Sequence, residues 1–363
     1  MKSAKSPQTL RLLRLAAAVS ALAMASCATP PPPPLPPIVI PPAAPPPPPV
    51  ALAPSVIEAA GAYRAYIRRA ASITGAFADG AAVQRAVEEG SAYEPIQFLR
   101  GEIAYAALVA LQNPQFVAAV RTYAVDPASR ADLSARLIAD PHYASALPSA
   151  GAAALLVSAT LRADAAKIRN AGELVKQAAY DVQRQNWSKL EVSGRDQRLA
   201  NAKMLSARPV AAAPEDVRLL AASVNGSDTS ALSLADATTL DPASAQFTAV
   251  VSRGLAIAAL AALGEGGPSN EAGLQRLLDE QTNAFCLNLA KLNLYQCLSV
   301  AKPYYEDVFC LGQHILIDTA QCVAKGAGGA TAAELAPAYQ PIVAKPAPPP
   351  KAPARPAARR RTR

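Results

Sequence analysis

The chain has 363 residues, of which 51% are hydrophobic and only 5% aromatic, and its formal net charge is +8. Four Lys or Arg lie in residues 1–26 and seven follow Pro337, and neither segment holds an acid. The remaining 24 basic and 27 acidic residues give the body a charge of about −3. The basic balance therefore belongs to the two ends and does not indicate a nucleic-acid-binding domain. Alanine, the best helix former, supplies much of the apolar share and predicts an all-α body, an alanine-rich helical bundle or helical repeat.

The N-terminus begins with a positive segment that contains no acid, MKSAKSPQTLRLLR, followed by an apolar stretch over residues 15–25. This stretch is shorter than the roughly 20 apolar residues of a permanent membrane helix. Residues 1–26 are therefore predicted to be an export signal rather than part of the fold.

The sequence Met24-Ala25-Ser26-Cys27 resembles the lipobox of bacterial lipoproteins, although Leu is commoner than Met at its first position. In that family the cysteine becomes the first residue of the mature protein and carries acyl chains such as palmitate. The resemblance implies lipidation of Cys27, whereas ordinary cleavage after the sequence AMA would leave a free thiol there. Ala28 stands where Asp favours inner-membrane retention in that family, which implies an outer-membrane protein facing the periplasm, with surface exposure as the alternative.

Residues 27–54 are expected to form a linker, because Pro30–Pro54 is dense in proline. Such a segment favours polyproline II, and its 25 residues would reach roughly 75–80 Å at about 3.1 Å each. We expect a solvated spacer between anchor and body; docking to a proline-recognition domain is the alternative.

Four Asn-Pro or Asp-Pro pairs in the body indicate where helices begin. Asn113, Asp126, Asp140 and Asp241 each precede a proline. A side chain of this kind caps the free amides of a helix, and proline fits the first helical position, so four helix starts are predicted.

Three longer helical segments are expected. Glu102–Gln112 and Gly254–Leu263 are apolar and alanine-rich, which predicts helices buried between neighbours. Ala165–Leu190 is interpreted as one amphipathic helix that carries Trp187.

Two stretches of the body are similar to each other. AYAALVAL starts at Ala104 and AIAALAAL at Ala256, and other short matches share an offset of about 150 residues. This favours a duplicated unit, with helical halves at residues 55–205 and 206–335.

Four cysteines remain for the body, and an exported chain meets an oxidising compartment, so they are expected to pair. If two helices fold back at residues 301–303, Cys297 and Cys310 lie about 6 and 10 Å from the turn. Cys286 and Cys322 lie about 22 and 28 Å from it. Bridged Cα atoms must lie within about 7 Å of each other. The nested pairs Cys297–Cys310 and Cys286–Cys322 are therefore predicted, in a C-terminal disulfide-stapled helical hairpin.

The hairpin resembles the twin-cysteine hairpins of coiled-coil–helix–coiled-coil–helix proteins in geometry alone, because its cysteine spacings differ. A metal site that combined Cys310 and His314 is the competing interpretation, but it needs reduced thiols. No Cys-x-x-Cys indicates a redox centre. No metal and no cofactor are predicted.

The sequence contains none of the common catalytic motifs. The sequence holds no glycine-rich phosphate loop, no His-Glu-x-x-His and no Gly-x-Ser-x-Gly. Only His142 and His314 could serve a triad. The adjacent acids Glu306 and Asp307 are expected to be charges on a helix surface. No catalytic residue is predicted.

The tail, residues 336–363, is rich in proline and arginine, and this composition predicts disorder. Its positive charges are expected to attach it to an anionic envelope surface, either lipid head groups, lipopolysaccharide or the cell-wall polymer. Nucleic acid is not expected as a partner of an exported chain. The predicted contacts are Lys345, Lys351, Arg355, Arg359, Arg360, Arg361 and Arg363.

The features together predict a non-enzymatic outer-membrane lipoprotein whose periplasmic body binds an envelope protein or scaffolds an assembly. The first alternative is a tether to cell wall or lipopolysaccharide through the tail. The second is an envelope enzyme with an unrecognised site in a helical cleft.

Overall fold

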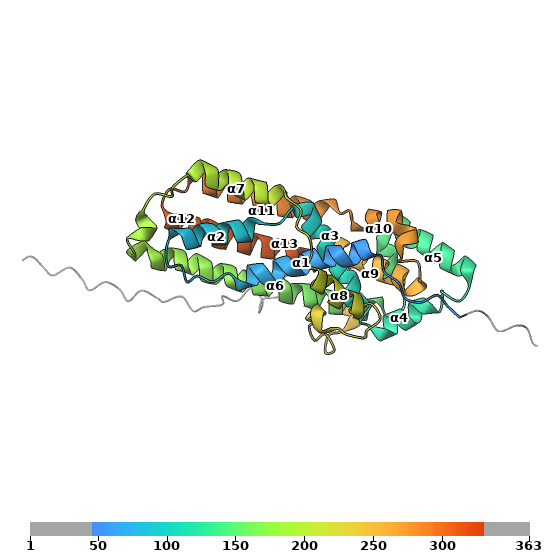
Figure 1. Cartoon of the computed structure of the whole chain (residues 1–363). Helices are drawn as coiled ribbons and strands as arrows, with labels where there is room; N and C mark the ends of the chain where they lie inside the picture. Colours follow the sequence, from blue (N-terminus) through green and yellow to red (C-terminus); the bar gives the residue numbers. More distant parts are fainter. Residues whose placement is uncertain (1–45, 330–363) are drawn as a thin grey trace, which may run out of the picture. The chain divides into compact units, whose positions relative to one another are not determined.

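The computed structural model describes residues 46–329, and these form the all-α unit shown in Figure 1. Within this range no β-strand occurs, so the predicted fold class is confirmed. The α-helices are α1 (Pro54–Ser72), α2 (Gly80–Ser91), α3 (Pro95–Ala110), α4 (Pro114–Arg121), α5 (Pro127–Ala139), α6 (Ala150–Asp181), α7 (Arg195–Ala207), α8 (Pro214–Ser223), α9 (Ala249–Leu263), α10 (Glu271–Leu278), α11 (Gln281–Val300), α12 (Tyr304–Cys310) and α13 (Asp318–Gly326).

Local capping explains two of the four predicted helix starts. The side chain of Asn113 accepts a hydrogen bond from the backbone of α4, and Asp126 does the same for α5. Asp140 and Asp241 also accept backbone hydrogen bonds, but they begin the short 3₁₀ helices η1 (Pro141–Ala146) and η5 (Pro242–Ser244) instead. The α-helix expected after Asp241 begins later, where Thr248 caps α9.

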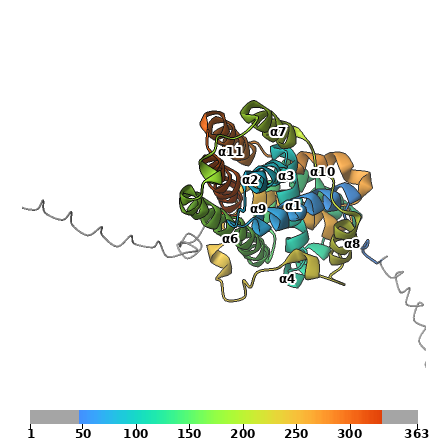
Figure 2. The ribbon, with the colours of Figure 1, turned by 60° about the vertical axis from the view of Figure 1, so that its left-hand side comes forward.

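The core is built around α3 and α9, the two alanine-rich helices predicted to be buried. They pack on each other, and in Figure 2 they lie among α1, α6, α8 and α10. A Cβ atom at Gly254 would lie 2.6 Å from the Cβ of Ala106, so glycine is needed for this close approach. The similar stretches from Ala104 and Ala256 therefore meet in space. Whether they descend from a duplication stays a prediction.

The sequence interpretation of α6 was wrong at both ends. The helix begins at Ala150 rather than Ala165, and it stops at Asp181. Trp187 lies beyond it in a 3₁₀ turn, η3 (Trp187–Lys189). The chain leaves the helical conformation at Gln185, and the single proton of the Ser188 hydroxyl is shared between the carbonyls of Val182 and Gln185. The amphipathic pattern alone gave no sign that the α-helix ends at Asp181.

The end of the proline-rich linker belongs to the body. Leu52 and Ala53 are buried, whereas the proline content predicts a solvated spacer up to Pro54. The backbone of Ala51 donates to the carbonyl of Ala261 at 3.2 Å, and that of Ala53 donates to Gly266 at 2.7 Å. We call residues 48–53 the docked arm. Its residues after Pro49 have backbone amides, two of which donate to the body, whereas a proline has no amide hydrogen to donate.

The C-terminal hairpin has the predicted nested disulfides. Cys286 and Cys322 are bonded with their Cα atoms 5.7 Å apart, and Cys297 and Cys310 with theirs 5.8 Å apart. The first helical segment of the hairpin is α11. The returning segment consists of α12 and α13, which are joined by the π-helical segment η7 (Leu311–Ile317). Nothing in the sequence predicted this π-helical segment.

This π-helical segment packs closely on α6. A Cβ atom at Gly312 would lie 2.6 Å from the backbone nitrogen of Lys176, and one at Gly172 would lie 2.7 Å from Ile317. Glycines on both sides thus allow the backbones to approach, and α6 supports the hairpin along this contact.

Candidate partner-binding surface on the cysteine hairpin

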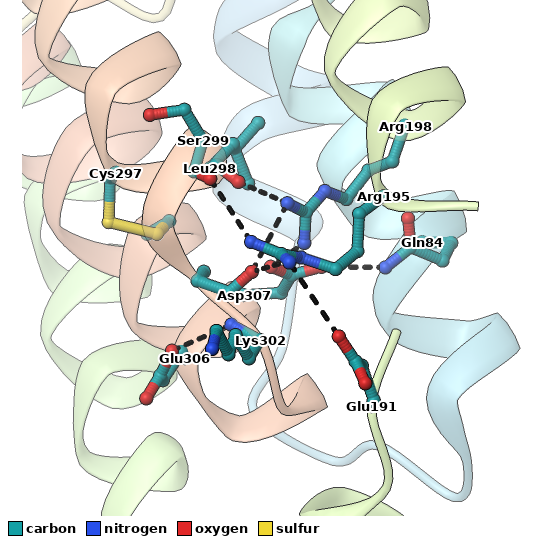
Figure 3. A network of polar contacts seen from close by, with 12 residues as sticks. Gln84, Glu191, Arg195, Arg198, Cys297, Leu298, Ser299, Lys302, Glu306 and Asp307 are labelled. Carbon is teal, nitrogen blue, oxygen red and sulfur yellow. Dashed lines mark hydrogen bonds and ion pairs between the residues drawn. A yellow bond between two sulfur atoms is a disulfide. The ribbon is translucent and has the colours of Figure 1, made fainter. Parts of the chain in front are cut away.

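A buried ion pair fixes the hairpin turn to the rest of the fold. Arg198 of α7 pairs with Asp307 of α12, and both side chains are buried (Figure 3). Gln84 of α2 donates to the other oxygen of Asp307 at 2.8 Å. Burial raises the pKa of Asp307, while Arg198 and Gln84 oppose that shift. The prediction of a surface charge at Asp307 was wrong, because its partners are distant in sequence. Its neighbour Glu306 accepts from the backbone of Lys302 at 2.8 Å.

Two arginines also satisfy the carbonyls at the end of α11. Arg195 donates to the carbonyls of Ala301 at 2.9 Å and Ser299 at 3.1 Å, and Arg198 donates to that of Leu298 (Figure 3). Carbonyls in the last turn of a helix have no partner within the helix. These bonds, together with the Cys297–Cys310 disulfide, hold the turn in one geometry.

An apolar pocket of about 270 Å³ lies beside this disulfide. Its walls come from α6, α11 and α12, and the side chains used below are Tyr180, Val300, Tyr305 and Phe309. Gln183 and Glu306 add polar groups at its edge. A preformed apolar pocket with few polar groups is the usual form of a binding site for an apolar side chain or ligand.

The outward side of α11 is apolar and uncharged. Phe285 is 70% exposed, Leu289 44%, Leu292 48% and Val300 72%. Their spacing places them along one stripe of the helix. Gln296 lies within the stripe, and the other exposed polar residues beside it are also uncharged, namely Gln281, Thr282, Asn288 and Ser299. The single charge of this helix, Lys291, is buried and lies 3.3 Å from the centre of the Tyr93 ring.

We call the stripe of Phe285, Leu289, Leu292 and Val300, together with the adjoining pocket, the hairpin face. The inward side of α11 packs in the core, so this helix is apolar on both sides. A surface helix normally packs one apolar side on the core and keeps charged or polar residues on the opposite side. Depletion of charge around exposed aromatic and aliphatic side chains is typical of protein interfaces. The arrangement suits binding rather than bond-making chemistry.

Elsewhere, a more polar cleft of about 650 Å³ lies between α1, α3, α10 and the segment before α8. There the Gln97 side chain donates to the carbonyl of Val210 and accepts from its amide, each at 2.8 Å. The nearby Arg100 pairs with Asp279 at 2.5 Å, and both are exposed. These polar groups are occupied with one another, and the cleft gathers no set of carboxylates with a catalytic geometry.

Three further buried titratable groups, at two places in the core, were missed by sequence reasoning. Glu102 in α3 is buried, its Oε1 atom has no hydrogen-bond partner within residues 46–329, and burial followed by the charge of Glu280 raises its pKa. Arg64 and Asp164 form an ion pair at 2.8 Å under Tyr105. Charged residues inside apolar helices were the available signal, but the sequence does not identify their partners.

The remaining predicted residues divide into two groups. Cys27 and the seven basic residues of the tail lie outside the described residues. His142 and His314 each have one neighbour of the kind found in a triad: Nδ1 of His142 is 3.4 Å from the Ser252 hydroxyl, and Nδ1 of His314 is 2.8 Å from a carboxylate oxygen of Asp318. Among the hydrogen bonds of residues 46–329, no carboxylate joins the first pair and no hydroxyl joins the second.

Over residues 46–329, no three His, Cys, Asp or Glu side chains gather as a metal site would require. In the same range no single helix is long and apolar enough to cross a membrane. The pair α3 and α4 has the length and composition together, but it bends by 86°.

No family model, no curated protein and no solved structure matches this chain. The sequence-based expectation that the body resembles no characterised family is thus confirmed.

Proposed function

We propose that this chain is a non-enzymatic envelope lipoprotein, anchored through Cys27, whose helical body binds an envelope protein through the hairpin face. One observation carries the proposal: α11 exposes Phe285, Leu289, Leu292 and Val300 on a side that holds no charge. Exposed apolar surface of this kind is costly in water unless a partner covers it.

The position of the face supports this function. The docked arm joins the body near α9 and α4, where Arg121 donates to the carbonyl of Pro48 at 3.0 Å. The turn between α11 and α12 lies at the opposite end of the described unit (Figure 1). A chain anchored through its N-terminus would therefore present the hairpin turn away from its attachment.

The test is crosslinking in cells, followed by detergent extraction and affinity purification through a tag inserted after Ser227, an exposed loop position. The Leu289→Glu/Leu292→Glu variant should lose a stoichiometric envelope protein that the wild type retains. Val125→Glu, at an exposed position in the α4–α5 connection, is the matched control and should retain it. Equal recovery with all three chains would contradict the proposal.

A tether to cell wall or lipopolysaccharide is the second candidate, favoured by the seven basic residues of the tail, which holds no acid. Deleting residues 345–363 should abolish recovery of anionic polymer in the same purification. The tether is contradicted if polymer is recovered equally without the tail.

A further inference from the structure

The hairpin face carries a projecting side chain at one end and a pocket at the other. Phe285, near the start of α11, is 70% exposed. The pocket beside Val300 lies 15 positions further along, about 22 Å at 1.5 Å per residue. A cavity of about 150 Å³ is enough to hold a benzene ring. The pocket's volume of about 270 Å³ therefore accommodates a phenylalanine side chain.

We propose that the hairpin face binds a second copy of this chain, with the two α11 helices antiparallel about a two-fold axis near Leu292. This inference rests on the proposed function and names its partner. A two-fold axis midway along α11 places each Phe285 over the pocket of the other copy. The same residues then contact each other in both directions, as an isologous interface requires.

Charge and area both fit this pairing. The exposed side of α11 holds no Asp, Glu, Lys or Arg. The one charged side chain at the edge of the pocket, Glu306, would lie beside Phe285 of the other copy rather than beside the second Glu306. The four apolar side chains expose roughly 400 Å² per copy, if a whole side chain of this kind offers about 150–200 Å². A pair would bury about 800 Å² of apolar area, or roughly 1,300 Å² in total at the usual apolar share. This total area lies at the lower end of the range for specific protein interfaces. Anchoring of both copies in one membrane would raise the effective concentration of each.

The first experiment identifies what covers the face. A photo-crosslinking residue replaces Leu292 in the full-length chain in cells, and mass spectrometry identifies each product. We expect a crosslinked product that contains two copies of this chain. When the crosslinking residue replaces Val125 instead, this product should not form. A product with a different protein alone would overturn self-pairing and leave the proposed partner binding intact. A crosslink within one chain, or no product, would overturn both.

The second experiment tests the antiparallel arrangement. Phe285→Ala should weaken pairing by about 30-fold, the effect of a hot-spot residue. The variants Phe285→Lys/Val300→Lys and Phe285→Glu/Val300→Glu change only exposed side chains. Each expressed alone should give little paired product, because like charges then face each other. Co-expression should restore it. If the mixture pairs no better than either variant alone, the arrangement is wrong.

Discussion

Replacing Arg198 by methionine should strongly destabilise the fold. The change leaves the buried carboxylate of Asp307 without its cation, and Gln84 remains as a partner at 2.8 Å. Breaking a buried ion pair by removing one member costs about 3–5 kcal/mol. The carbonyl of Leu298 also loses its donor. For a body of this size, a loss of about 3 kcal/mol corresponds to a fall in Tm of roughly 6–12 °C.

The assay is thermal and urea unfolding followed by circular dichroism, with disulfides intact. Without the guanidinium, the folded-state pKa of Asp307 rises further above its unfolded value, so the folded state takes up a proton as the pH falls. The destabilisation should therefore shrink between pH 7 and pH 5. Arg195→Met, on the same helix but partly exposed, is the control and should cost less than about 1 kcal/mol. Equal, pH-independent losses for the two variants would refute the reasoning.

Three further changes test other contacts. Replacing both Cys286 and Cys322 by serine removes a disulfide that joins residues 36 positions apart. The unfolded chain then gains conformational entropy, so urea unfolding should show a free energy of unfolding lower by about 4 kcal/mol. Burial holds the pKa of Lys291 well below that of an exposed lysine. Wild-type stability should therefore rise with pH as the pH approaches the unfolded-lysine pKa of about 10.4, and urea midpoints of Lys291→Met should lack this rise. Gly101→Ala places a Cβ atom 2.5 Å from the carbonyl oxygen of Ala59, and Tm measurements should show a loss of about 1–3 kcal/mol.

Features decided by local chemistry were predictable from sequence. The caps at Asn113 and Asp126 depend on atoms three residues away, and both were found. The nested disulfides followed because two helices and a turn leave one pairing with matched heights. The buried character of α3 and α9 followed from composition.

Features decided by distant partners were not predictable. Asp307 looked like a surface charge until α7 placed Arg198 beside it, 109 positions away in the chain. The hairpin face was missed for a related reason. Both sides of α11 are apolar in sequence, and only packing shows which side the core covers. The docked arm is likewise fixed by α9, which lies far along the chain.

The hairpin limits how far the chain can be drawn out by force. If it is pulled from both ends, as a tether between two surfaces would be, the disulfide between Cys286 and Cys322 carries tension directly across their 36-residue separation. Roughly 120–130 Å of contour length is thereby withheld from extension. The docked arm has no such covalent bypass, since backbone hydrogen bonds at Ala51 and Ala53 and apolar packing hold it. Under load the chain should yield first at the arm, while the hairpin keeps its shape.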